Sequence, residues 1–212
     1  MNITVHHLNN SKSQRVLWLL EELELPYEVK HYSRQPTGMA APELKQIHPL
    51  GKAPAVEVDG VVIAESAAVS ELIVRRYGKG KLAPPVDSKE YPHYLEMLHY
   101  PEASASMVIV MAVFAPVYGL GSDPNSKALI MSQAEQHLRY IESILEKNPY
   151  LTGPEFTVPD TQITFILQMA RDCSAIIKDR PVLLEYLDRM EARPAYKRAI
   201  ERGGPFSLNF FG

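Results

Sequence analysis

The sequence has almost no sulfhydryl groups, no excess of one charge and no long hydrophobic run, and each absence argues against a class of protein. Its single cysteine, Cys173, cannot form an internal disulfide, which is typical of a reducing compartment. Lysine and arginine number 22 against 25 aspartate and glutamate residues, and the net charge of -3 gives no reason to expect nucleic acid or an anionic membrane as a partner. The longest apolar run, near residues 107–118, contains Pro116 and is too short to predict a membrane span.

The chain also shows no targeting signal and no internal repeat. Residues 1–5 lack the basic region and long apolar core of a signal peptide, so we expect a cytoplasmic location. Apolar residues make up 46% of the chain and charged residues 22%, which is typical of a soluble globular protein. The length of 212 residues predicts one large domain or two small ones packed together.

The first part of the chain alternates between strand-like and helix-like patterns. Residues 3–8 form a short extended run, and from Ser13 the apolar side chains follow a helical period. Pro26 is expected to end that helix before a second alternating run at residues 27–32. Because a helix connects the two runs, we expect parallel strands, with a further short helix around residues 42–47.

The clearest local signal is a hairpin. Residues 56–63 alternate in polarity on both sides of Asp59-Gly60, which predicts a tight antiparallel turn. A helix is expected to follow from Ser66 to about Tyr77.

Beyond residue 78 the pattern becomes helical throughout. Four stretches are predicted to be helical, the last continuing through Pro194: residues 91–118, 126–146, 157–175 and 182–202. We therefore predict a small α/β domain over residues 1–78, a linker over 79–90 and an all-helical domain over 91–212.

Ser11 is the first candidate site residue. It precedes Gln14 by three positions, which predicts a capping box at the start of the first helix, and such a serine is commonly no more than a cap. A capping hydroxyl accepts through a lone pair, so its hydrogen stays available to a sulfur held beside the positive end of the helix. That setting lowers the pKa of a thiol. Asn10 and Ser13 are neighbours that share or replace this role.

Two later segments offer groups that suit the ends of a small acidic peptide. Pro54 either starts a strand or follows a cis peptide bond that turns the backbone of Ala53 outward, where an extended peptide can pair with it. Ser66 at a helix start suits a carboxylate, and Glu65 beside it suits an ammonium group. Lys52 is within reach of a second carboxylate. The sequence therefore predicts a site for a small acidic thiol peptide.

With these motifs in place, the chain resembles the cytosolic glutathione S-transferase family, in its serine-type form found in bacteria and fungi. The segments that carry the resemblance are residues 11–17, 51–54, 65–66 and 156–160. The resemblance implies an α/β thioredoxin-like N-terminal domain, an all-α C-terminal domain and a homodimer. No cysteine stands near Ser11, which argues against the classes that use one.

The same resemblance implies roles for individual residues. Ser11 is expected to contact the glutathione sulfur, and Ala53 to pair with the cysteinyl backbone before a cis Pro54. Glu65 and Ser66 are expected to hold the γ-glutamyl end. By the same resemblance, Lys52 meets the glycyl carboxylate.

The helical half supplies candidates for a hydrophobic-substrate site and one structural motif. Helical spacing favours a packed core for most of its large side chains, while Tyr100, Met107 and Tyr118 are candidates for an apolar pocket. Thr157 and Asp160 predict a capping box of purely structural importance.

The histidines and the cysteine indicate no further site. The seven histidines lack the spacing of metal ligands, so we expect no metal. Cys173 is expected to be a buried packing residue rather than a nucleophile. The position of the apolar end at residues 206–211 is left open.

The predicted function is therefore conjugation of glutathione to small hydrophobic electrophiles, in a detoxification role. Glutathione serves as co-substrate, with no separate cofactor. Two alternatives stay open: a glutathione-dependent disulfide reductase or peroxidase on the same fold, and a non-catalytic glutathione-binding module.

Overall fold

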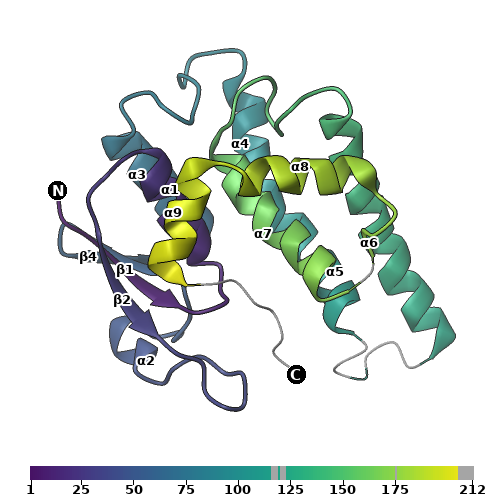
Figure 1. The fold of residues 1–212 in the computed structure, drawn as a ribbon, viewed down its shortest axis with the longest axis horizontal. Coiled ribbons are helices and arrows are strands. Elements are labelled where there is room, and N and C mark those ends of the chain that lie inside the picture. The colour runs from purple at the N-terminus through teal and green to yellow at the C-terminus, as the bar shows by residue number, and fades with distance from the viewer. Residues whose placement is uncertain (116–118, 120–122, 175, 205–212) are drawn as a thin grey trace. The chain divides into compact units, whose positions relative to one another are not determined.

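The computed structural model describes all residues except 116–118, 120–122, 175 and 205–212 (Figure 1). By their contacts, the described residues form two compact units. The first comprises Met1–Lys81 together with the described residues from Glu191 on, and the second comprises Leu82–Met190. The first unit holds the whole sheet, and the second is built from helices.

The first unit is organised by a four-stranded mixed sheet of order β2-β1-β3-β4. Its strands are β1 (Ile3–Leu8), β2 (Glu28–Tyr32), β3 (Ala55–Val58) and β4 (Val61–Ala64). β1 pairs in parallel with β2 and antiparallel with β3, as the helix-linked and hairpin-linked patterns predict. At the hairpin, Asp59 and Gly60 have φ values of 49° and 84°, the left-handed conformations that a two-residue turn of this kind requires.

Three helices follow the predicted order in this unit: α1 (Gln14–Glu22), α2 (Leu44–Ile47) and α3 (Ser66–Tyr77). Every residue of α1 from Gln14 to Leu20 is buried, so the helix is fixed by packing along most of its length. It ends at Glu22, earlier than Pro26 alone indicates, because Glu24 adopts a left-handed φ of 53° that turns the chain away.

A helix from the end of the chain, α9 (Pro194–Gly203), also belongs to this unit and lies beside α1 (Figure 1). The rings of Trp18 and Tyr196 meet edge to face with centroids 5.1 Å apart. Arg193 donates two hydrogen bonds, of 2.6 and 2.8 Å, to the carboxylate of Glu22. The predicted helical domain extended to residue 212, whereas these contacts group α9 with the α/β unit.

The junction before α9 explains why one predicted helix is two. Arg193 is extended, with φ -62° and ψ 133°, because a residue that precedes proline is excluded from the helical region by the ring of Pro194. The predicted stretch 182–202 therefore divides into α8 (Pro181–Glu191) and α9.

The second unit packs around one buried helix, α7 (Val158–Asp172). Every residue from Val158 to Ala170 is buried, and the helix contacts each segment of the run that begins the unit. That run consists of α4 (Tyr91–Tyr100), the π-helical turn η1 (Pro101–Ala105) and α5 (Ser106–Phe114), and α6 (Pro124–Leu145) packs against its last part. Part of the predicted helix 91–118 thus lies outside the described residues.

Asp160 at the start of α7 confirms the predicted capping box. Its side chain is fully buried and accepts from the backbone N–H of Thr157 at 2.9 Å and of Leu151 at 3.0 Å. The hydroxyl of Tyr186 on α8 donates to it at 2.8 Å. Burial raises the pKa of Asp160 to about 6 although these donors favour the carboxylate. The residue therefore joins a loop, α7 and α8 through one buried group.

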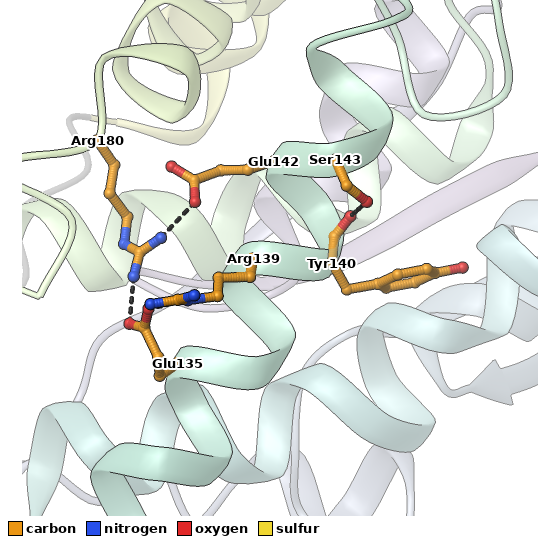
Figure 2. A network of polar contacts seen from close by, with 6 residues as sticks. All are labelled: Glu135, Arg139, Tyr140, Glu142, Ser143 and Arg180. Carbon is orange, nitrogen blue, oxygen red and sulfur yellow. Dashed lines mark hydrogen bonds and ion pairs between the residues drawn. The ribbon is translucent and has the colours of Figure 1, made fainter.

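A second polar cluster joins α8 to α6 (Figure 2). Arg180, immediately before α8, contacts the carboxylates of Glu135 and Glu142 on α6, and Arg139 donates to Glu135 at 2.5 Å. The side chain of Arg180 is 15% exposed, whereas that of Glu135 is 40% exposed. The cluster is therefore a partly buried ion-pair network, and it lines a shallow depression at the surface of this unit.

One correction concerns the apolar content of the helical unit. The continuous helical run Tyr91–Phe114 contains an 18-residue window with a mean hydropathy of 1.3, so it could cross a membrane by length and composition alone, contrary to the prediction that no run approaches such a span. In the described structure 44% of that window is buried within the protein, and the run packs against α6 and α7. Core helices of soluble proteins pass the same test of length and composition.

Candidate functional site

The register of the sheet brings three loops to one of its ends. Ala55, the first residue of β3, pairs with His6 near the end of β1 and with Ala64 at the end of β4. The loop that leaves β1, the segment that enters β3 and the segment that leaves β4 therefore meet at this end. These are the loops that contain the candidate residues predicted from the sequence: Asn10, Ser11, Ser13, Lys52, Ala53, Pro54, Glu65 and Ser66.

Ser11 and Ser13 lie together, but the predicted capping box does not form. α1 begins at Gln14 with Ser13 as its N-cap, so Ser11 is two positions before the cap. The Ser11 Oγ accepts from the backbone N–H of Ser13 at 3.2 Å and lies 2.7 Å from the Ser13 Oγ. The prediction fails because residues 11–13 already turn, which directs the hydroxyl of Ser11 toward Ser13 rather than toward Gln14. Both side chains are buried, Ser11 at 7% exposure and Ser13 at 0%.

His7 joins this pair from β1, and the sequence analysis missed its role. Its Nδ1 lies 2.8 Å from the Ser13 Oγ, and its Nε2 lies 2.9 Å from the carbonyl oxygen of Gly203 on α9. Burial is the largest cause that lowers the pKa of His7, to about 4, so the ring is neutral at physiological pH. The sequence did offer one signal for His7, because it stands on the first predicted strand, one loop before Ser11 and Ser13. It offered no signal for the contact with Gly203, which lies 196 positions away.

Asn10 contributes its backbone to the shape of the loop. It has a left-handed φ of 51°, and its carbonyl accepts from Arg34 Nη2 at 2.9 Å. Arg34 also donates through Nη1 to the carbonyl of Gly38 at 2.9 Å, and its backbone N–H donates to the side chain of Asn9 at 3.0 Å. Arg34, which the sequence did not indicate, therefore holds the loop after β2 against the loop after β1.

The peptide bond between Ala53 and Pro54 is cis, as predicted. Pro54 is buried and Ala53 is half-buried, immediately before β3. Among the residues that the structure describes, neither the N–H nor the C=O of Ala53 is engaged in a hydrogen bond. The backbone of Ala53 is therefore available for pairing with an extended peptide. Lys52, just before it, is exposed.

Glu65 and Ser66 differ sharply in their surroundings. Glu65 is exposed and has a left-handed φ of 69°. Ser66 is the first residue of α3 rather than its N-cap, and its buried hydroxyl accepts from Arg15 Nη1 at 3.2 Å. The guanidinium of Arg15 is itself buried at 1% exposure. A helix N-terminus backed by a buried positive charge favours an anionic group at this position.

The three candidates for the hydrophobic-substrate site differ in what the structure shows of them. Tyr100 is half-buried, with its hydroxyl 2.8 Å from His137 Nδ1, and burial raises its pKa. Met107, a pocket candidate, is 65% exposed, and Met111 on the same helix is 39% exposed, so neither side chain lies in the packed core that helical spacing favours for most of this stretch. Tyr118 lies outside the described residues.

Cys173 is half-buried at the end of α7 rather than fully buried as predicted. Burial raises the pKa of its thiol to about 11, which disfavours the nucleophilic thiolate at neutral pH. Within the described part of the chain, no group of three or more histidine, cysteine, aspartate or glutamate side chains is placed to hold a metal ion.

The fold and this loop arrangement define a class. A thioredoxin-like α/β unit and an all-helical unit, with a cis proline before the hairpin, form the glutathione S-transferase fold. Two family models match the chain: the glutathione S-transferase N-terminal domain over residues 2–75 and the C-terminal domain over residues 112–202.

Individual relatives agree with the models. "Glutathione S-transferase 3" of Schizosaccharomyces pombe is 34% identical and covers 99% of this chain and 91% of its own length. "Glutathione S-transferase 1" of Saccharomyces cerevisiae is 27% identical and covers 98% of each. A crystal structure of a glutathione S-transferase from Actinobacillus pleuropneumoniae has a TM-score of 0.88 at 32% identity, covering 99% of this chain and 97% of that chain. The chain belongs to the glutathione S-transferase family and is an enzyme of that class.

Proposed function

We propose that the protein binds glutathione at the end of the sheet where the three loops meet, and conjugates its sulfur to small hydrophobic electrophiles. The observation that carries this proposal is the register of β1, β3 and β4, because it brings the hydroxyl of Ser11, the backbone of Ala53 and the start of α3 to one place. Each of these groups suits a different part of one tripeptide.

The two ends of glutathione are assigned by charge. The γ-glutamyl end carries an ammonium and a carboxylate, which suit exposed Glu65 and the α3 terminus at Ser66 respectively. Arg15 behind Ser66 strengthens the attraction for the carboxylate because its charge is buried. The cysteinyl backbone pairs with Ala53 before the cis Pro54, and Lys52 reaches the glycyl carboxylate.

Ser11 is the residue that we assign to the sulfur, ahead of Asn10 and Ser13. Ser13 is fully buried behind it, whereas Ser11 retains some exposure. The backbone of Asn10 is held by Arg34, which makes it a shaping residue in this proposal. A hydroxyl donor beside the start of α1 stabilises a thiolate, and a pKa lowered by about two units is worth roughly 2.7 kcal/mol. No general base is required, and glutathione is the co-substrate rather than a bound cofactor.

The remaining parts of the proposal concern the second substrate and the setting. Tyr100, Met107 and Tyr118 are proposed to line the electrophile site, and the exposure of Met107 leaves it available for contact. We propose further that the enzyme is a cytoplasmic homodimer that acts in detoxification.

Replacing Ser11 with alanine tests the central assignment. The thiolate absorbance of glutathione bound to the Ser11→Ala variant should titrate about one to two pH units higher than with the unaltered protein. Conjugation to an aryl halide at neutral pH should fall by roughly tenfold or more, because the sulfur is then mostly protonated.

A Ser11→Thr variant keeps the hydroxyl and serves as the matched control, with a thiol pKa close to that of the unaltered protein. An unchanged titration in Ser11→Ala would refute the role of Ser11. Faster turnover of a glutathione mixed disulfide than of the aryl halide would favour the reductase alternative, and bound glutathione with an unshifted thiol pKa in the unaltered protein would favour the non-catalytic one.

A further inference from the structure

Ser11 is the last member of a buried chain of polar contacts that begins on α9. The carbonyl of Gly203 lies 2.9 Å from His7 Nε2, His7 Nδ1 lies 2.8 Å from the Ser13 Oγ, and the Ser13 Oγ lies 2.7 Å from the Ser11 Oγ. All of these groups belong to the α/β unit, and the side chains of His7, Ser11 and Ser13 are all buried. The proposed function uses only the final hydroxyl.

The hydrogen positions along this chain follow from the nature of its first member. A carbonyl oxygen can only accept, so His7 Nε2 carries the hydrogen and donates to Gly203. The opposite tautomer would aim a ring lone pair at the carbonyl oxygen at 2.9 Å. In the neutral ring, Nδ1 is then an acceptor.

Ser13 must therefore donate to His7. Its hydroxyl has one hydrogen, and the carbonyl of Leu8 is a second acceptor at 3.3 Å, longer than the 2.8 Å to His7. Once that hydrogen is committed, the 2.7 Å contact between the two hydroxyls requires Ser11 to donate to Ser13. While the His7 ring is neutral, the hydroxyl hydrogen of Ser11 thus points toward Ser13. A sulfur held beside Ser11 would then meet the lone pairs of the Ser11 oxygen.

We propose that His7 is a positioning residue that acts through Ser13 to hold the hydroxyl hydrogen of Ser11 away from the bound sulfur, so that a glutathione thiolate must compete for it. The inference rests on the function proposed above, because it concerns how Ser11 meets the glutathione sulfur. The neutral ring expected from the depressed pKa of His7 supports the assigned tautomer. Among the described residues, His31 on β2 is a titratable group near the ring, with its ring centroid 5.7 Å away.

A proton relay from the thiol to His7 is the competing explanation for the same contacts. In that relay the thiol hydrogen passes to Ser11, the Ser11 hydrogen to Ser13 and the Ser13 hydrogen to His7 Nδ1, leaving a thiolate and an imidazolium. A ring whose pKa is about 4 is a poor acceptor for a proton from a thiol with a pKa near ~8.5. Rotation of the Ser11 hydroxyl toward the thiolate breaks only one neutral hydrogen bond.

The two explanations predict opposite signs for a matched pair of His7 variants. A glutamine at position 7 keeps a donor where Nε2 meets Gly203 but removes the acceptor at Nδ1. The hydrogen of Ser13 can then go to Ser11, at 2.7 Å, or to the carbonyl of Leu8, at 3.3 Å, and the hydrogen of Ser11 is released whenever Ser13 donates to the nearer one. An asparagine keeps an acceptor near Nδ1 but loses the donor to Gly203. The readout is the pKa of the thiol of bound glutathione, followed by thiolate absorbance.

We expect His7→Gln to lower that thiol pKa by roughly half to one unit, the value of one neutral hydrogen bond, and His7→Asn to leave it near that of the unaltered protein. Ser13→Ala removes the acceptor of Ser11 directly and should lower the thiol pKa by a similar amount. A rise in His7→Gln would establish the relay and overturn the proposal. If the thiol pKa shifts in His7→Asn but not in His7→Gln, the proposal is overturned, and the contact of His7 with Gly203 only fixes the position of α9.

Two controls separate this inference from the proposed function. If Ser11→Ala leaves the thiol pKa unchanged, the assignment of Ser11 fails and the inference fails with it. If Ser11→Ala raises the thiol pKa while His7→Gln and Ser13→Ala do not move it, only the inference fails. Because a His7 variant can lose stability, Ser13→Ala provides the second, independent perturbation of the same hydrogen bond.

Discussion

Replacing Asp160 with asparagine should destabilise the fold by an amount that follows from the donors around its carboxylate. The Asp160 Oδ1 accepts from Leu151 and Tyr186, and Oδ2 accepts from the N–H of Thr157 and, at 3.3 Å, from its hydroxyl. The asparagine amide keeps one acceptor oxygen, which can still accept from Leu151 and Tyr186. Its NH₂ group then faces the N–H of Thr157, which is also a donor. Losing one charge-assisted hydrogen bond and burying two opposed donors costs about 2 to 3 kcal/mol.

The pH dependence gives a second, signed test of the same residue. Burial raises the pKa of Asp160 to about 6 in the folded protein, against ~3.9 in an unfolded chain. The folded state therefore binds the proton more tightly, and the resulting stability is complete below about pH 4 and lost as the pH rises through 6. From this group alone, the unaltered protein should gain up to about 3 kcal/mol over Asp160→Asn on acidification from pH 7 to pH 4.

Urea denaturation followed by far-ultraviolet circular dichroism at both pH values measures the two quantities. Asp172→Asn is the matched control, because its carboxylate lies at the other end of α7, is 33% exposed and pairs with Arg171. It should change the free energy of unfolding by less than about 1 kcal/mol. A difference in free energy of unfolding between the unaltered protein and Asp160→Asn that became smaller on acidification would refute the reasoning. The hydrogen-bond donors would then lower the pKa of Asp160 by more than burial raises it.

The remaining predictions concern three other contacts. Gly203→Ala should destabilise the protein by about 1 to 3 kcal/mol in urea denaturation, because its Cβ would clash with Gln14 Oε1 and lie 2.7 Å from a methyl group of Leu17. An unaffected midpoint would show that α9 does not approach α1 so closely. Arg180→Met should cost about 1 to 2 kcal/mol, less at high salt, and a loss insensitive to salt would contradict an electrostatic origin. Arg15→Met should weaken glutathione binding by roughly tenfold in calorimetry, with little change in the thiol pKa of bound glutathione. A large change in that pKa would show that Arg15 acts on the sulfur rather than on the carboxylate.

The sequence predicted the features that depend on neighbouring residues. The parallel pairing of β1 and β2 and the turn at Asp59-Gly60 are confirmed, because helix-linked strands and a dipeptide that tolerates left-handed conformations each have a local signature. The capping box at Asp160 is confirmed as well, and so is the cis bond before Pro54, which the local pattern left open and the family resemblance implied.

The features that the sequence did not predict depend on distant contacts. The contact between His7 and Gly203 spans 196 positions, and the buried approach of Arg15 to Ser66 spans 51. Neither follows from periodicity, because each is decided by which helix packs against which. The direction of the Ser11 side chain was predicted wrongly for a related reason: the loop turned two residues before the helical pattern began.

The position of α9 has a consequence for synthesis on the ribosome. Ribosomal synthesis makes Gly203, whose carbonyl lies 2.9 Å from His7 Nε2, 196 residues after His7 itself. A nascent chain therefore lacks the contact that fixes the tautomer of His7 until α9 has been synthesised. In the inference drawn above, the hydrogen positions around Ser11 are therefore set only after α9 has packed against α1.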